Sequence, residues 1–182
     1  MEEEMNAEVY HERQKLQFCL LHALNNLFQE RDAFSKADLD GIAEDLILNN
    51  PNPVKWTPIS AVLNPHYNMF TGNYDANVLM AALERRGKRL TWHDKRNQAA
   101  TINLDGLMGI VLNVTVRRFA GLLKNRHWVT LRKINGVWYN LDSDLRAPSA
   151  FTNVDGVRVF LDSVIRAGDQ ILLVTNDNLD AL

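Results

Sequence analysis

The dipeptide Asn135-Gly136 lies in the middle of the stretch HWVTLRKINGVWYNLDS, residues 127–143, between two runs in which apolar and polar residues alternate. Alternation with a period of two is typical of β-strands, and Asn-Gly favours the two-residue type I′ turn that joins antiparallel strands. A turn of this length allows one register, in which Val129 lies opposite Asp142. The sequence therefore predicts a β-hairpin and its cross-strand neighbours.

The predicted register brings a histidine and a carboxylate to one face of this hairpin. His127 shares the face of Val129 because side chains alternate along a strand, so Asp142 is its diagonal neighbour, with backbone positions about 7–8 Å apart. Asn140 lies on the same face but roughly 6–7 Å farther along the strand, which makes it the second choice as a partner. A change of one residue in the turn would move Asp142 to the other face.

Outside the hairpin, helical spacing dominates the first half of the chain and strand patterns dominate the second. Residues 49–73 contain four of the five prolines, which indicates a loop. Helices are predicted over 18–30, from the N-cap Ser35 through residue 48, over 75–86 with a stop at Gly87, and over 154–168 with Asn153 as N-cap and Gly168 as terminator; strands are predicted over 88–94, 107–114 and 170–175. Segregated helices and strands favour an α+β fold with an antiparallel sheet.

Length and composition favour one domain. The chain has 182 residues, 46% of them hydrophobic and 23% charged, and we expect a domain over residues 1–182 with an ordered core of about 9–176 and short tails. The net charge of −2 disfavours a nucleic-acid partner. The acidic start MEEEMNAEVYHERQ is not typical of a signal peptide, and no apolar run approaches the ~18 residues of a membrane span. We expect a monomer in the cytoplasm or also the nucleus, without an integral membrane segment.

The only cysteine, Cys19, stands where the first predicted helix begins, in LQFCLLHALNN. A single cysteine excludes an internal disulfide and fits a reducing compartment. Packing is the commonest role of such a residue. Metal binding is disfavoured because no HExxH motif or Cys/His cluster is present. A nucleophile is physically reasonable because a helix N-terminus carries roughly half a positive charge and stabilises a thiolate. The five histidines are His11, His22, His66, His93 and His127.

Two of these histidines are candidates for the base that a nucleophilic cysteine needs. His22 shares the helix face of Cys19, but the sequence offers no obvious carboxylate partner, so packing or hydrogen bonding behind a cleft is its preferred role. His127 has Asp142 as its predicted neighbour and is the preferred base. The order cysteine, histidine, carboxylate matches papain-like thiol hydrolases. Trp128 points to the opposite face of its strand and is predicted to pack.

Four stretches carry a resemblance to a known family: VYHERQKLQFCLLHALNNLFQ (9–29), GNYDANVLMAAL (72–83), RHWVTLRKINGVWYNLDSDLRAP (126–148) and ILLVT (171–175). They resemble the Josephin family of cysteine deubiquitinases, and the resemblance is closest to its short, stand-alone members. It implies a papain-like α+β fold. Residues 35–72 resemble the ataxin-type members only in outline, so substrate gating and chain-linkage preference are not carried over.

The resemblance also implies the role of each site residue. Cys19 matches the nucleophile, His127 the general base, and Asp142 the orienting residue, which is Asn or Asp across the family. Gln14, five residues before Cys19, matches the side chain that completes the oxyanion hole. The implied reaction is hydrolysis of isopeptide, peptide or ester bonds after the C-terminal Gly of ubiquitin. The implied partners are ubiquitin and ubiquitinated proteins, and no cofactor is implied.

Two other functions stay open at the level of sequence. One is a weakly active or inactive ubiquitin-binding module of the same fold, and the other is a different thiol acyl-transfer enzyme such as a small amidase. The basic tail of ubiquitin would suit acidic groups at the rim of the site, for which Asp144 and Asp75 are candidates. Met69, Phe70 and Tyr74 could contact ubiquitin or pack beneath the third predicted helix.

Overall fold

The computed structural model describes residues 8–14, 18–49, 67–68, 73–118 and 123–177. The helices are α1 (Cys19–Phe28), α2 (Lys36–Leu48), α4 (Ala76–Arg85), α5 (Val154–Arg166) and the short 3₁₀ helices η1 (Ala99–Thr101) and η2 (Leu104–Gly106). The strands are β1 (Tyr67–Asn68), β2 (Asn73–Tyr74), β3 (Lys88–Trp92), β4 (Gly109–Arg118), β5 (Leu123–Ile134), β6 (Val137–Asn140), β7 (Ser149–Ala150) and β8 (Gln170–Asn176). Most of the predicted proline-rich loop lies outside the described residues.

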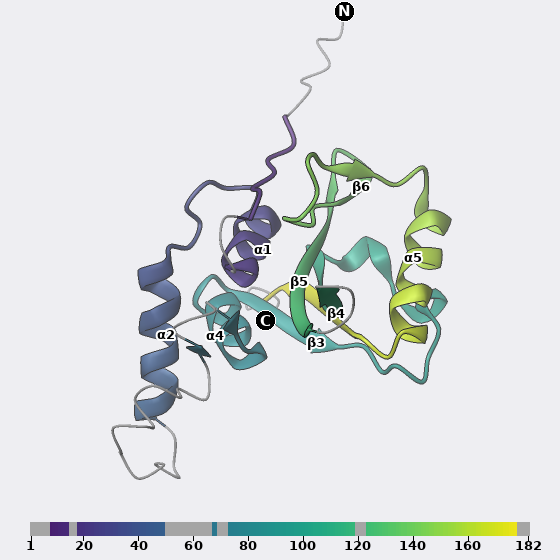
Figure 1. Cartoon of the computed structure of the whole chain (residues 1–182). Helices are drawn as coiled ribbons and strands as arrows, with labels where there is room; N and C mark the ends of the chain where they lie inside the picture. Colours follow the sequence, from purple (N-terminus) through teal and green to yellow (C-terminus); the bar gives the residue numbers. More distant parts are fainter. Residues whose placement is uncertain (1–7, 15–17, 50–66, 69–72, 119–122, 178–182) are drawn as a thin grey trace, which may run out of the picture.

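Six of these strands form one antiparallel sheet in the order β3-β8-β4-β5-β6-β7. Helices α1, α2 and α4 lie to one side of this sheet and α5 to the other (Figure 1). The predicted α+β class with an antiparallel sheet is therefore confirmed. The structure adds β1, β2, β7 and both 3₁₀ helices, all too short to give a periodic sequence pattern.

Alternation along the central strands gives the sheet two apolar faces. Val111 of β4 and Trp128 of β5 belong to the core cluster that packs with α1, α2 and α4. Their sequence neighbours Leu112 and Val129 belong to a second cluster, with α5 and η1. A strand buried on both sides shows this pattern because successive side chains point in opposite directions.

The predicted helix ends are set by the expected capping residues. Ser35 accepts a hydrogen bond from the backbone N–H of Asp38, and the Asp38 carboxylate bonds back to Ser35, which forms a capping box. Asn153 caps α5 through the N–H of Gly156. Helix α1 begins at Cys19, one residue later than predicted, and ends at Phe28, because Gln29 adopts a left-handed conformation that stops it.

The predicted hairpin is confirmed in both turn type and register. Asn135 and Gly136 have φ values of 49° and 82°, as a type I′ turn requires at its two central residues. Leu131 pairs with Asn140, and the hydrogen bond from Leu141 N–H to the carbonyl of Thr130 continues the same register beyond the end of β6. Val129 and Asp142 therefore lie opposite each other, as predicted.

Gly109, the first residue of β4, allows α1 to approach the sheet. A Cβ at this position would lie 2.5 Å from Leu27 Cδ1 and 3.0 Å from the Leu131 carbonyl oxygen. Because one of these atoms is backbone, we expect Gly109→Ala to lower the free energy of unfolding by about 1–3 kcal/mol. The control is Gly41→Ala in α2, where nothing lies within 4 Å of the added Cβ. Urea denaturation of both variants checks this, and an unchanged midpoint for Gly109→Ala would contradict it.

Among the helices of the described ranges, none has both the length and the apolar character needed to cross a bilayer.

Candidate active site

The thiol of Cys19 lies at the first residue of α1. Phe18 occupies the N-cap position and has no side-chain oxygen, so it cannot cap the backbone N–H groups of the first turn. Those N–H groups, with the positive end of the helix dipole, favour a negative charge at Cys19. Cys19 is 3% exposed, which the packing interpretation would also explain. What distinguishes the two interpretations is the interaction of Cys19 with His127, which raises the pKa of that ring.

His127 connects Cys19 to Asp142. The Nε2 atom of His127 lies 2.6 Å from Oδ1 of Asp142, and because a carboxylate only accepts, Nε2–H is the donor. This leaves Nδ1 as the ring nitrogen for Cys19. The predicted diagonal contact across the hairpin is therefore present, and residues from α1, β5 and the segment after β6 converge. Asn140, the second choice, instead accepts from the backbone N–H of Asp142.

The electrostatics of this chain favour a charged imidazolium ring. Burial by itself lowers the pKa of His127, whereas hydrogen bonds with Asp142 and Cys19, and their negative charges, raise it, with a net pKa of about 10. For Asp142, burial raises the pKa, but the hydrogen bond and charge of His127 bring it below the ordinary value of 3.8. The arrangement can therefore hold a thiolate, an imidazolium and a carboxylate in sequence.

Gln14 lies on the segment before α1 and is tied to the same region. Its backbone N–H donates to the carbonyl of Ser143, next to Asp142, at 2.9 Å. Its Oε1 atom is buried and accepts no hydrogen bond from the described part of the chain. Gln14 is thus held beside the segment that carries Asp142, and its amide Nε2–H₂ is a donor of the kind an oxyanion needs.

Glu12 is a partner that the sequence interpretation missed. Its Oε2 atom lies 3.3 Å from Nδ1 of His22 and accepts from Nδ2 of Asn25 at 2.9 Å. Burial raises the pKa of Glu12, but the contact with His22 and the hydrogen bond from Asn25 bring it below its ordinary value. The statement that His22 has no evident carboxylate partner was therefore wrong, because the partner comes from the extended segment before the helix. The predicted supporting role of His22 fits this contact.

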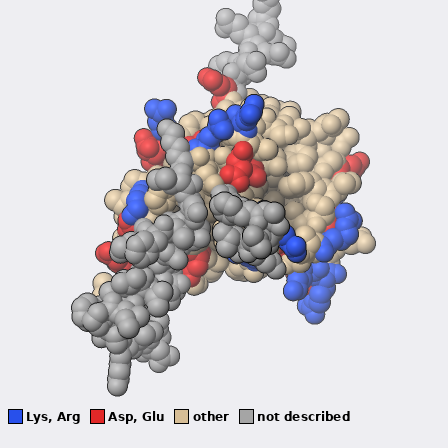
Figure 2. Space-filling view, in the orientation of Figure 1, with Lys and Arg blue, Asp and Glu red and all other residues tan. Residues whose placement is uncertain are grey.

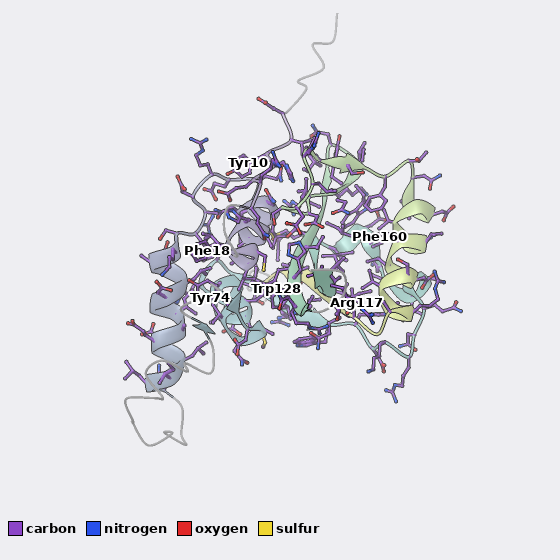
Figure 3. All side chains as sticks on the ribbon, in the orientation of Figure 1. Tyr10, Phe18, Tyr74, Arg117, Trp128 and Phe160 are labelled. Carbon is purple, nitrogen blue, oxygen red and sulfur yellow. The ribbon has the colours of Figure 1, made fainter. Side chains whose placement is uncertain are left out.

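The other residues singled out from the sequence separate into packing residues and site neighbours. Trp128 is 3% exposed and donates from Nε1 to the carbonyl of Tyr74; Figure 3 labels both. Tyr74 is also buried, belongs to the core cluster shared with α1, α2 and α4, and donates from its hydroxyl to Asp40 of α2. Asp75 caps α4 through the N–H groups at 77 and 78. Met69 and Phe70 lie outside the described residues. Asp144 is near the site, with Oδ2 3.7 Å from His127 Nε2.

One group of side chains in the described ranges has ligand atoms close enough together for a metal ion. It consists of His127, Asp142 and Asp144, whose ligand atoms lie within 4.8 Å of one another. The direct 2.6 Å hydrogen bond between His127 and Asp142 accounts for the position of both groups without an ion.

Comparison with known sequences decides the family. The family model described as Josephin matches residues 14–175, a range that begins at Gln14 and includes Cys19, His127 and Asp142. The chain belongs to the Josephin family. This confirms the resemblance carried by the four quoted stretches and, with the observed architecture, the papain-like α+β fold of Josephin domains.

Three relatives show where the chain stands within the Josephin family. A protein of Arabidopsis thaliana named Josephin-like protein is 62% identical over 86% of this chain and 44% of its own length. Josephin-2 of Homo sapiens is 43% identical over 93% of this chain and 87% of its own length. Ataxin-3 of Gallus gallus is 27% identical over 93% of this chain and 46% of its own length. The chain thus spans less than half of the first and third relatives and most of the second.

The charged ring of this Josephin-family chain leads to a prediction about pH. Because the pKa of His127 is about 10, above the ordinary 6.5, the ring keeps its proton between pH 6 and pH 9 and places a positive charge beside the Cys19 sulfur over that range. We expect the rate of alkylation of Cys19 by iodoacetamide to differ by less than about threefold between pH 6 and pH 9. For an unperturbed thiol, the thiolate fraction is about 200-fold smaller at pH 6 than at pH 9. The single cysteine makes the measurement specific. An alkylation rate that is 100-fold lower at pH 6 than at pH 9 would contradict this effect of the charged ring.

Proposed function

We propose that this chain is a cysteine deubiquitinase that hydrolyses isopeptide, peptide or ester bonds after the C-terminal Gly of ubiquitin. One observation carries the proposal: in a chain of the Josephin family, His127 is hydrogen-bonded to Asp142 and interacts with the thiol at the start of α1, which raises the pKa of the ring. A cysteine that only packs needs no such histidine and carboxylate beside it. The roles of Cys19, His127, Asp142 and Gln14 are part of this proposal.

The first half of the proposed reaction forms an acyl enzyme. His127 Nδ1 holds the proton that Cys19 has given up, and the thiolate attacks the carbonyl carbon of the terminal glycine. Negative charge then develops on the carbonyl oxygen, where the backbone N–H of Cys19 and the side-chain amide of Gln14 would donate to it. When the tetrahedral intermediate collapses, the imidazolium gives its proton to the leaving amine or alkoxide, and a thioester of ubiquitin remains on Cys19.

The second half repeats these steps with water as the nucleophile. Neutral His127 accepts a proton from water, hydroxide attacks the thioester carbonyl, and the thiolate leaves as ubiquitin is released with a free carboxylate. Asp142 keeps the ring oriented through both halves, because Nε2–H donates to its carboxylate while Nδ1 exchanges the proton.

The charge around the site fits a basic substrate tail. Figure 2 shows acidic side chains gathered near the middle of one face, in the region where Figure 1 places α1 beside β5. Asp144 is 41% exposed and lies 3.7 Å from His127, so it combines access with proximity to the reacting groups. Because Asp75 is engaged in capping α4, we assign the proposed rim role to Asp144.

A ubiquitin amide reporter tests this function against its two alternatives. We expect the wild-type chain to release a fluorophore from the C-terminus of ubiquitin and not from a short acyl-Gly-Gly peptide, which a small amidase would also cleave. Ubiquitin binding without release by the wild-type chain would favour the binding module of the same fold. Release from the short peptide at an equal kcat/KM would favour the amidase.

Gln14 supplies a prediction specific to the oxyanion step. We expect Gln14→Ala to lower kcat by about 10²–10³-fold with little change in KM, because an oxyanion-hole donor acts in the transition state and not in the ground state. Gln14→Glu is the matched variant, since it keeps the size but places a carboxylate near the oxyanion. Steady-state kinetics with the ubiquitin reporter check this. A change confined to KM would assign Gln14 to ground-state binding.

A further inference from the structure

Three successive backbone carbonyls, at residues 141–143, are held by groups from the N-terminal part of the chain. Because a carbonyl oxygen only accepts, each partner is a donor. The three bonds, each 2.9 Å long, run from Asn26 Nδ2 to Leu141 O, from His11 Nε2 to Asp142 O, and from Gln14 N to Ser143 O. The segment that carries Asp142 is therefore fixed in place by side chains and backbone more than 100 residues away in sequence.

Asn26 is where these contacts meet. Its Oδ1 accepts from the backbone N–H of Glu12 at 2.6 Å, and its Nδ2 donates to the Glu12 carbonyl at 3.2 Å and to the Leu141 carbonyl at 2.9 Å. The residue is 0% exposed. One neutral amide thus uses an acceptor and both donor hydrogens to join helix α1, the segment 8–14 and the end of the hairpin.

Each of the three joined segments carries one site residue close to the junction. Helix α1 begins with Cys19, Gln14 lies two residues after Glu12, and Leu141 immediately precedes Asp142. A helix is stiff and rises about 1.5 Å per residue, so an anchor at Asn26 fixes where Cys19 lies relative to the other two segments. Because the side chain of Asn26 is uncharged, its influence on the site is geometric.

We propose that Asn26 is a positioning residue of this active site, whose side-chain amide sets the mutual placement of Gln14, Cys19 and Asp142. The inference rests on the proposed function for the reaction that these groups perform, but the placement itself can be tested without ubiquitin. The groups that interact electrostatically with His127 are Cys19 and Asp142, and Asp144 lies nearby. The charge of His11 helps to lower the pKa of Asp142. If Asn26 is removed, we expect Asp142 to shift away from His127 and the pKa of the ring to fall.

The neighbouring asparagine provides a matched control. Asn25 is also in α1, 1% exposed, and hydrogen-bonded to the same segment, through the Glu12 carboxylate, and to the N–H of Phe34. Its described hydrogen bonds do not involve residues 141–143. Asn25→Ala therefore removes a similar number of buried hydrogen bonds from the same helix turn and leaves the contact with Leu141 intact.

The experiment compares the iodoacetamide reaction of Cys19 at pH 6 and pH 9 in four chains: wild type, Asn25→Ala, Asn26→Ala and Asn26→Asp. Asn26→Asp keeps the acceptor for Glu12 N–H and loses the hydrogen bonds donated to the carbonyls of Glu12 and Leu141. We expect the ratio of the pH 6 rate to the pH 9 rate to fall about tenfold or more in both Asn26 variants and to stay within about twofold of wild type in Asn25→Ala. Thermal unfolding of all four chains identifies any variant that does not fold. If Asn26→Ala does not fold, the ratio measured for Asn26→Asp tests the proposal.

Two results would overturn the positioning role: a wild-type ratio in folded Asn26 variants, or an equal fall in Asn25→Ala. A purely structural role would raise the alkylation rate at both pH values, since loosening exposes the thiol, and would leave the ratio unchanged. Failure of the ubiquitin proposal would look different, because the ratio would still respond to Asn26 while the ubiquitin reporter stayed uncleaved by the wild-type chain. With an active wild type, we also expect kcat to fall about 10–10²-fold in Asn26→Ala with KM unchanged.

Discussion

Replacing Cys19 by alanine is expected to lower kcat for ubiquitin substrates by about 10⁶-fold, to the limit of detection. Cys19 is the only thiol of the chain, so no second cysteine can take over the attack. Alanine is smaller than cysteine and is compatible with a helix start, so the fold should be retained. The ubiquitin reporter measures the loss, and circular dichroism with thermal unfolding confirms the fold.

The same variant separates catalysis from binding. Because the thiol forms a bond only during the reaction, ubiquitin affinity measured by calorimetry should change less than about threefold in Cys19→Ala. Turnover that survives in Cys19→Ala would contradict the proposed nucleophile. Loss of binding together with loss of turnover would show that Cys19 maintains the binding surface, and would also contradict its purely chemical role.

Replacing Asp142 by alanine is expected to lower kcat by about 10³–10⁴-fold, the range found when the orienting member of a catalytic triad is removed. His127 would lose its Nε2 partner at 2.6 Å and the negative charge that helps to raise its pKa to about 10. With that pKa lowered, the ring gives up its proton at lower pH, and less of it is charged near neutrality. The pH profile of kcat/KM in the wild type and the variant measures this shift.

Asparagine at position 142 distinguishes orientation from charge. Its side-chain oxygen can accept from His127 Nε2–H as the carboxylate does, so Asp142→Asn should keep the ring orientation and lose only the charge. We expect a loss in kcat at least tenfold smaller than that of Asp142→Ala. Asp144 lies 3.7 Å from His127 Nε2 and has the proposed role of an acidic rim residue. Asp144→Asn should therefore raise KM with little effect on kcat. Equal losses in both Asp142 variants would mean that charge, and not orientation, is the main contribution.

The hairpin contact could be predicted because it depends on local chemistry. Asn135-Gly136 allows one tight turn, and strand alternation then determines that His127 and Asp142 share a face. The helix caps Ser35 and Asn153 were predictable for the same reason, since each bonds to an N–H three residues later. Features that depend on residues close in sequence leave a pattern that can be recognised without a structure.

The contacts that hold the site together could not be predicted in this way. Asn26 lies 115 residues from its partner Leu141, and His11 lies 131 residues from the Asp142 carbonyl that it binds. The extended segment 8–14 has no periodic pattern, so its pairing with α1 and with the end of the hairpin is determined only by the tertiary fold. The burial of Cys19 was equally hidden, because a helix start can face a groove or the core.

Covalent labelling by ubiquitin that carries an electrophile at its C-terminus tests the central claim most directly. The account predicts that the wild-type chain gains the mass of one ubiquitin, that peptide mapping places the adduct on Cys19, and that Cys19→Ala gains nothing. Because Cys19 is 3% exposed, the same measurement shows whether the ubiquitin tail reaches the thiol. A folded wild-type chain that reacts with iodoacetamide at pH 6 and yet takes up no ubiquitin would contradict the account.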